Sequence, residues 1–375
     1  MKNKRFAIMT LKDSPNYGGV LQAYALETAI KRYGFACDLI DYITPEFKQK
    51  FTFFGKPPRM SHIYWIYKKM QYPLMRKMMR KIMPFYTNHM TLTRKFDSSE
   101  ELKELNRIYD GFVTGSDQVF ACDLNSFNEC YYLNFVDSDK VKFSYAASFG
   151  RTINMLKDDE ITFIKRGLSN LDKISLRERS GIDIVKELSG KSSCDVLDPT
   201  FLLDKTEWQK ISSFPKKIKQ NYVLCYLMQS RKNDKYALKY ARKIAKEKHL
   251  KIVKICRGLT SVLWSGTAFV PTVEEFIGLY LNASYVITNS FHGVTFAINF
   301  KKQFNAFIEG DIESGRNSRI HNICSYLDLL NRIKVVGSND YAINETPIEY
   351  DAITKKLAIL KEKSSTFLKE ALENK

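Results

Sequence analysis

Four polar segments of this 375-residue chain each follow a run of apolar residues and carry groups that bind anions or move protons. They are Asn16-Tyr17-Gly18-Gly19, Gly115-Ser116-Asp117-Gln118, Ser175-Leu176-Arg177-Glu178 and Thr288-Asn289-Ser290-Phe291-His292-Gly293. An apolar run that ends in such a segment is typical of a buried strand whose carboxyl end borders a ligand site. The four segments therefore form the candidate site.

Two residues are candidates for catalysis. Imidazole titrates near neutral pH, and His292 lies between an apolar run and Gly293, where a helix begins after a strand. We expect it to bind an anion or transfer a proton. Asp117, in a loop with Gly and Ser, is expected to orient a hydroxyl or act as an acid or base. The alternative for Asp117 is a helix N-cap or an Asx turn.

The other candidates are binding residues. Arg177 suits a carboxylate or phosphate, because guanidinium binds both with two hydrogen bonds. Gly18 and Gly19 would let backbone N–H groups approach an anion at a helix start, although a plain turn explains them equally well and neither GxGxxG nor a P-loop is present. Arg316 and Arg319 are further cations, or parts of a mobile basic loop. Polar side chains complete the set: Asn16, Ser116, Gln118, Asn289 and Ser290.

No metal site and no hydrolase triad are predicted. The chain contains neither an HExxH nor a GxSxG pattern, and its seven cysteines are scattered and never spaced as CxxC. Such cysteines are typical of reduced core thiols in a cytoplasmic protein. No apolar run approaches 18 residues, and the first residues lack the features of a signal peptide.

The positive charge is concentrated in one segment. The net charge is +18, and residues 48–95 contain 12 of the 59 Lys and Arg, 7 of the 11 Met and no acidic residue. Apolar side chains every four residues from Ile66 to Ile82 predict an amphipathic helix, kinked or broken at Pro73. A basic amphipathic helix is typical of a protein that lies on an anionic membrane surface. The alternative is a helical insertion that packs its Met side on the domain.

Strands alternate with helices over the rest of the chain, which predicts an α/β fold with two parallel, Rossmann-like domains facing each other across a cleft. Residues 1–204 form the first domain, with the basic helical insertion 48–95. Residues 205–220 form a polar linker, and residues 221–345 form the second domain. A closing helix within 346–375 is expected to cross back to the first domain.

Six motifs together carry a resemblance. They are NYGGVLQ (16–22), GSDQ (115–118), SYAASFG (144–150), SxRE (175–178), DPTFLL (198–203) and NSFHG (289–293). In this order they resemble the polysaccharide pyruvyl transferase family, with weaker similarity to about residue 330. The basic segment 48–95 lies outside these motifs.

The resemblance implies a fold similar to GT-B glycosyltransferases and transfer of a pyruvyl group from phosphoenolpyruvate to a sugar. Two hydroxyls of one sugar become a cyclic pyruvate ketal, phosphate leaves, and no cofactor is needed. The resemblance implies that Arg177 binds an anionic group of the donor and that His292 binds the donor or gives a proton. Some members have Arg-Leu-His where this chain has Ser290-Phe291-His292. Either Arg316 or Arg319 is expected to replace the missing arginine, or the donor is held differently.

Two other functions stay open at this point. One is a GT-B glycosyltransferase that uses a nucleotide-sugar, and the other is a non-catalytic protein that binds nucleic acid or a membrane. Nucleic acid is disfavoured because no RNP, KH or zinc-finger pattern accompanies the charge. We expect a cytoplasmic enzyme, peripheral on the inner face of the cell membrane if the sugar of the surface polysaccharide is lipid-linked. The acceptor sugar and the oligomeric state are not predicted.

Overall fold

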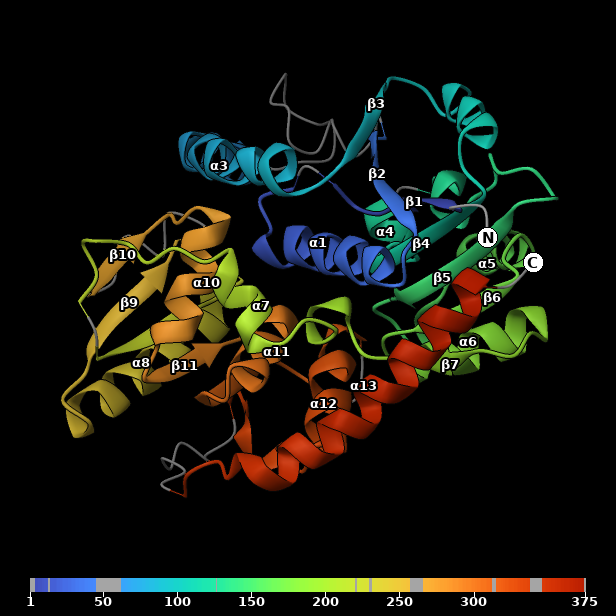
Figure 1. The fold of residues 1–375 in the computed structure, drawn as a ribbon. Coiled ribbons are helices and arrows are strands. Elements are labelled where there is room, and N and C mark those ends of the chain that lie inside the picture. Colours follow the sequence, from blue (N-terminus) through green and yellow to red (C-terminus); the bar gives the residue numbers. More distant parts are fainter. Residues whose placement is uncertain are drawn as a thin grey trace.

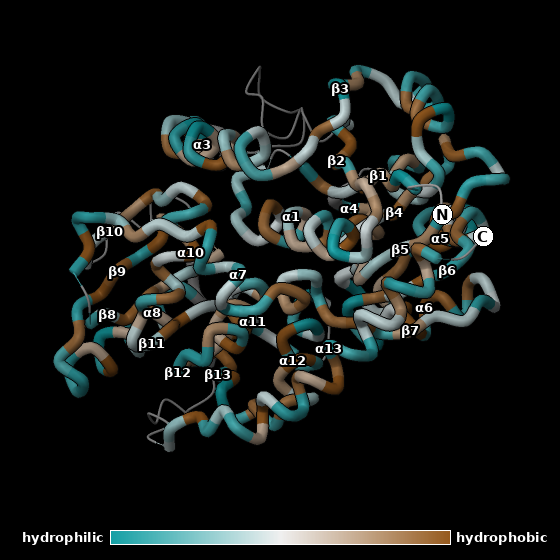
Figure 2. Tube along the Cα trace, in the orientation of Figure 1, coloured by the Kyte–Doolittle hydropathy of each residue, from teal (hydrophilic) through white to brown (hydrophobic). Residues whose placement is uncertain are grey.

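The chain folds around two parallel sheets, each covered by helices on both faces (Figure 1). The computed structural model describes residues 4–12, 14–44, 62–125, 127–219, 221–228, 231–256, 266–311, 315–337 and 346–373. Its strands are largely buried, and much of their length is hydrophobic (Figure 2). The predicted fold class, two Rossmann-like α/β domains, is confirmed.

The first sheet has seven parallel strands in the order β3-β2-β1-β4-β5-β6-β7. They are β1 (Arg5–Met9), β2 (Ala36–Tyr42), β3 (Leu92–Phe96), β4 (Gly111–Asp117), β5 (Val141–Ala147), β6 (Lys173–Leu176) and β7 (Cys194–Asp195). The strand order reverses between β1 and β4, so the connections after these two strands leave to opposite faces and open a crevice between them.

The second sheet repeats this topology with six parallel strands, in the order β10-β9-β8-β11-β12-β13. They are β8 (Tyr222–Tyr226), β9 (Lys251–Ile255), β10 (Thr267–Phe269), β11 (Tyr285–Thr288), β12 (Gln303–Ile308) and β13 (Ile333–Val335). Every residue of β8 and β11 is buried, which explains why both strands are continuous apolar runs in the sequence. The order reverses here between β8 and β11.

Helices of the first domain and its connection are α1 (Tyr17–Arg32), α3 (His62–His89), α4 (Cys122–Asn125), α5 (Asp158–Ser169), α6 (Arg179–Ser189) and α7 (Lys205–Lys210). Those of the second are α8 (Arg231–Glu247), α10 (Val273–Asn282), α11 (Phe291–Asn299), α12 (Ser318–Tyr326) and α13 (Tyr350–Glu373). Short 3-10 helices are η1 (Glu101–Arg107), η2 (Glu129–Tyr132), η3 (Ile153–Met155), η4 (Pro199–Phe201), η5 (Gly315–Asn317) and η6 (Leu330–Arg332).

The two domains are joined by more than the chain connection. Tyr17, at the start of α1, donates a hydrogen bond to the Pro271 carbonyl at 2.8 Å and stacks on Phe276 of α10 at 4.7 Å. Helix α13 runs from the second domain to the first (Figure 1), where Ser364 accepts a hydrogen bond from the Leu197 amide at 2.9 Å. The same hydrophobic core therefore continues from one domain into the other.

Three local expectations were wrong. Residues 205–219 are not a plain linker, because an Asp204–Glu207 capping box starts α7 and Trp208 is fully buried. Residues 115–117 belong to β4 rather than to a loop. Helix α3 is not broken at Pro73, which was one of the two alternatives: it continues through this residue, whose side chain is exposed, so the lost hydrogen bond lies on the solvent side.

The basic insertion is also not purely helical. Residues 45–61 lie outside the described part of the chain, and the segment ends in the edge strand β3. Within α3 the expected apolar stripe does not share one face. Met78 and Ile82 are buried, whereas Ile66 and Met70 are 50% and 60% exposed. A repeat of four residues advances about 400° around a helix, so the stripe turns by about 40° at each step.

Candidate active site

The two points of strand reversal lie opposite each other and enclose a cavity of about 350 Å³ between the domains. Its walls come from the segments after β1, β4 and β11, the end of the segment after β8, and the start of α12. Eight of the predicted site residues line it: Asn16, Asp117, Gln118, Asn289, Ser290, His292, Arg316 and Arg319. Segments that are far apart in the sequence thus meet at one place, as expected for open α/β sheets.

The remaining predicted residues lie behind the cavity wall. Ser116 is fully buried and donates a hydrogen bond to the Ala146 carbonyl at 2.8 Å, which makes its role structural. Gly18 packs directly on His292, and a Cβ atom at this position would lie 2.2 Å from Nδ1 of the imidazole. At Gly19 the nearest atom, Asn16 Nδ2, would be 3.4 Å away. Gly18 is therefore needed to seat the histidine.

Arg177 lies between two carboxylates. Its Nη1 donates to Asp198 Oδ2 at 2.9 Å and its Nη2 to Asp117 Oδ1 at 3.0 Å, while its side chain is only 1% exposed. Burial would raise the pKa of Asp117, but Arg177 and His292 outweigh it and hold that pKa below its ordinary value. Because both terminal nitrogens face carboxylates, Arg177 positions Asp117 rather than facing the cavity as a ligand for the donor.

Asp198 is the functional residue that our sequence reasoning missed. Its Oδ2 also lies 3.5 Å from His292 Nε2, and its Oδ1 accepts hydrogen bonds from the amide and hydroxyl of Thr200. Burial would raise the pKa of Asp198, yet His292 and Arg177 together hold it well below its ordinary value. The available signal was Asp198-Pro199, which is typical of a helix start and so indicated only a structural role.

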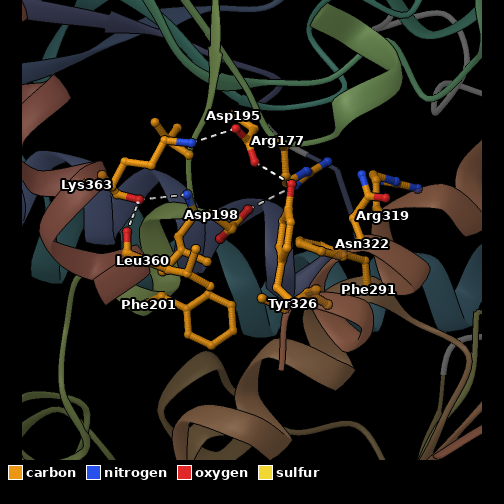
Figure 3. Close-up of a pocket in the computed structure, with 14 residues that line it drawn as sticks. Arg177, Asp195, Asp198, Phe201, Phe291, Arg319, Asn322, Tyr326, Leu360 and Lys363 are labelled. Carbon is orange, nitrogen blue, oxygen red and sulfur yellow. Dashed lines mark hydrogen bonds and ion pairs between the residues drawn. The ribbon is translucent and has the colours of Figure 1, made fainter. Parts of the chain in front are cut away.

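Arg319 is a buried cation at the cavity wall. It is 8% exposed, and no described carboxylate lies within ion-pair distance of it. Burial and the nearby Arg177 lower its pKa to about 10. The guanidinium groups of Arg319 and Arg177 both lie over the Phe291 ring, at 5.7 and 4.6 Å (Figure 3). Arg316 is more exposed and pairs with Asp123 at 2.9 Å.

Two helices begin at the cavity without a side-chain cap on their N-termini. The N-caps are Asn16 for α1 and Ser290 for α11, and neither side chain caps its helix. Neither helix has an acidic residue in its first turn, and the buried Oδ1 atom of Asn16 has no hydrogen-bond partner. A helix N-terminus carries a partial positive charge and orients N–H groups that favour an anion. The cavity is therefore suited to a negatively charged ligand.

Asn289 has a structural role at the edge of the cavity. Its Oδ1 accepts a hydrogen bond from the Met228 amide at 2.6 Å, and its Nδ2 donates to Asp234 at 3.1 Å. It thereby ties the end of β8 and helix α8 to the end of β11. Among the described residues, no group of His, Cys, Asp or Glu is arranged to hold a metal ion.

A second, water-sized cavity of about 20 Å³ lies on the inner side of Arg177 and Phe291 (Figure 3). On its wall, Asp195 of β7 pairs with Lys363 of α13 at 2.6 Å and accepts a hydrogen bond from the Tyr326 hydroxyl of α12. Since α12 also carries Arg319, these contacts fix the helix that presents the unpaired cation.

Fold and site together define an α/β protein with a cavity, lined by cationic and polar groups, between two Rossmann-like domains. A family model described as polysaccharide pyruvyl transferase matches residues 16–310. The chain therefore belongs to the polysaccharide pyruvyl transferase family, and it is a transferase whose acceptor is a sugar. No curated protein matches the chain.

Three solved structures are similar to this chain over most of its length. UGT89C1 from Arabidopsis thaliana, complexed with UDP-L-rhamnose, is 10% identical, with 99% of this chain and 98% of that one covered and a TM-score of 0.50. A glycosyltransferase from Rickettsia africae is 11% identical over the full length of both chains, with a TM-score of 0.46. UDP-GlcNAc 2-epimerase from Methanocaldococcus jannaschii is 12% identical, with 96% and 92% covered and a TM-score of 0.47. The likeness to UGT89C1 shows a shared GT-B-like fold.

Proposed function

We propose that this protein transfers a pyruvyl group from phosphoenolpyruvate to two hydroxyls of one sugar residue, forming a cyclic ketal and releasing phosphate. One observation carries the proposal. The buried Arg319, which has no carboxylate partner in the described part of the chain, faces the same cavity as two uncapped helix N-termini and His292. Phosphoenolpyruvate carries a phosphate and a carboxylate, so it needs several such groups at once.

Arg319 takes the role of donor ligand in this proposal. Guanidinium binds carboxylate and phosphate with two parallel hydrogen bonds, and burial strengthens the attraction because water does not screen it. The N-termini of α1 and α11 complete the anion site through Asn16 and Ser290. Arg319 thereby replaces the arginine that some family members have at the position of Ser290.

His292 is proposed to supply the proton that starts the reaction. Protonation of the donor's methylene carbon, C3, makes C2 electrophilic, and a sugar hydroxyl then forms a C–O bond to C2. A second hydroxyl of the same sugar forms the other C–O bond as the bond from C2 to the phosphate oxygen breaks. The two hydroxyls release two protons. One returns to His292 in place of the proton given to C3, and the other leaves with the released phosphate. Asp198 Oδ2 lies 3.5 Å from His292 Nε2 and orients the imidazole in this proposal.

Asp117 is proposed to orient the acceptor. Its Oδ1 is held by Arg177, and Asp117 contributes to the cavity wall beside Asn16 and Gln118. A carboxylate with a lowered pKa stays ionised and accepts a hydrogen bond from a sugar hydroxyl, although it is a weak base. Asp117 therefore fixes which hydroxyl faces C2 of the donor.

Phosphate release from phosphoenolpyruvate, measured with a panel of free and lipid-linked sugars, tests this function. We expect release with at least one acceptor, and a loss of roughly 10²–10⁴ in rate for His292→Ala. Release that is unchanged in His292→Ala would remove the histidine from the mechanism. Stabilisation by a nucleoside diphosphate and not by phosphoenolpyruvate would instead favour a nucleotide-sugar glycosyltransferase.

A further inference from the structure

The solvent-facing side of α3 combines apolar and basic side chains. Ile66 is 50% exposed and Met70 is 60% exposed, although both are large apolar residues. Basic residues are exposed on the same helix: Lys69, Arg76, Lys77 and Arg80. No acidic residue occurs between positions 48 and 95, so this side of α3 has no negative charge of its own.

The geometry of the helix places these residues on one face. At about 100° per residue, Lys77 lies within about 20° of Ile66 around the helix axis, and Arg80 lies within about 40°. Met78 and Ile82 fall on the opposite part of the helix and are buried. Ile66 therefore lies among the basic side chains, and Met70, about 40° further around the axis, lies at their edge toward Met78.

The packed side shows that α3 is already attached to the protein. Phe85 is buried and contacts the Tyr24 ring of α1 at 5.5 Å, and His89 Nε2 lies 3.0 Å from a carboxylate oxygen of Glu274 in α10. The exposed face is thus not needed to complete the core. Helix α1, which α3 contacts here, begins at the active-site cavity, so the basic face and the site share one rigid support.

Among the described residues, three of the basic side chains of this face have no carboxylate partner. No described carboxylate lies within ion-pair distance of Arg76, Lys77 or Arg80. We propose that this face of α3 docks on an anionic phospholipid surface, with Ile66 and Met70 inserted among the lipids and the basic side chains at the headgroups. Charge alone would suit nucleic acid as well, but two exposed apolar side chains amid the charge favour a lipid surface.

Helix α8 provides a matched control. Its residues Lys239, Lys243 and Lys246 are equally basic and exposed, but no large apolar side chain among its described residues is exposed. The test compares two triple variants by flotation with vesicles of phosphatidylglycerol and phosphatidylcholine, and with vesicles of phosphatidylcholine alone. The first variant replaces the three α8 lysines by Ser. The second replaces Arg76, Lys77 and Arg80 of α3 by Ser.

We expect the full-length protein to bind the anionic vesicles and not the neutral ones. Three fewer charges on α3 should weaken binding by about 100-fold, whereas the α8 variant should stay within about twofold of the wild type. The double variant Ile66→Ser/Met70→Ser should keep its preference for anionic vesicles but release them at a lower salt concentration, because only the charge remains. All substituted side chains are exposed, and a thermal melt checks each fold.

Equal losses in the α3 and α8 variants would overturn the proposal, since binding would then follow net charge. Absence of binding by the wild type would overturn it too. So would binding of a single-stranded RNA that anionic vesicles do not displace, because nucleic acid would then be the partner. The experiment contains no substrate, so its result is independent of the proposed pyruvyl transfer.

Discussion

His292 Nε2 lies 3.5 Å from Asp198 Oδ2, although the two residues belong to different domains. Asp198 precedes η4 in the segment that leaves the first sheet, and His292 lies in the first turn of α11. The same two elements meet again at Thr200 and Thr295, whose hydroxyls are 3.4 Å apart. The proposed proton donor is therefore held by the domain opposite to its own.

Replacement of Arg319 by Met should weaken binding of phosphoenolpyruvate without destabilising the folded protein. Arg319 is a buried cation without a carboxylate partner in the described part of the chain, which costs stability, so we expect the free Arg319→Met protein to be as stable as the wild type or more stable. Phosphoenolpyruvate at 100 times its Kd should stabilise the wild type by about 2.7 kcal/mol and the variant by much less. Thermal melts with and without the donor measure both effects.

Arg316→Met is the matched control, because Arg316 is exposed and already paired with Asp123. Its donor-dependent stabilisation should remain close to that of the wild type. A full stabilisation by phosphoenolpyruvate in Arg319→Met would show that the donor anion binds elsewhere.

Gly18→Ala is expected to displace the catalytic histidine. The added methyl would lie 2.2 Å from His292 Nδ1, so the ring must move, and a displacement of about 1 Å costs on the order of 100-fold in turnover. Gly19→Ala should retain activity, because its nearest neighbour would be 3.4 Å away. Steady-state phosphate release compares the two variants. Similar rates for both would contradict the proposed packing of Gly18 on His292.

Arg177→Met should destabilise the fold strongly. It leaves Asp117 and Asp198 buried without their shared cation, which typically costs about 3–5 kcal/mol. Lys356→Met, which removes the exposed pair with Asp328, should cost less than about 1 kcal/mol. Urea unfolding at pH 7 gives both values, and comparable losses would mean that the buried pair contributes no more than the surface one.

The cost of Arg177→Met should also depend on pH. Both Asp117 and Asp198 have pKa values below that of an unfolded Asp, which is about 3.9. Their ionised forms stabilise the wild type above about pH 4, and this contribution is lost as the pH falls further. In Arg177→Met, protonation removes the unpaired charge of these buried carboxylates and so stabilises the folded variant. Urea unfolding between pH 3 and 7 should therefore show that the free energies of unfolding of the wild type and of Arg177→Met become more similar as the pH falls. A difference that does not change with pH would argue against ionised Asp117 and Asp198.

The sequence predicted the fold well because parallel strands buried on both faces leave a clear apolar pattern. The apolar runs before two of the candidate segments are the buried strands β4 and β11, and these segments do meet at one cavity. What could not be predicted is which charges pair. In the sequence, Arg177 has the features of a residue that binds an anion. Only the folded chain shows that its guanidinium group pairs with two carboxylates, whereas Arg319 has no carboxylate partner among the described residues.

The α3 stripe shows a second limit of sequence reasoning. A spacing of four residues indicates a helix correctly, but it drifts around the helix axis, so Ile66 and Ile82 cannot share a face. The predicted helix is confirmed. The predicted buried side is wrong at Ile66 and Met70, which are exposed. Among the described residues, no helix is long and apolar enough to cross a membrane.

Helix α13 has a consequence for the order in which the protein forms during translation. Its residues Leu368 and Leu372 are fully buried in the core shared with the first domain, and its Phe367 ring lies 6.3 Å from that of Tyr145 in β5. A ribosome must therefore release more than 150 residues after β7 before the first domain can close its core. A nascent chain whose synthesis stops after the first domain would expose apolar surface that chaperones recognise. It would also lack His292 of the second domain.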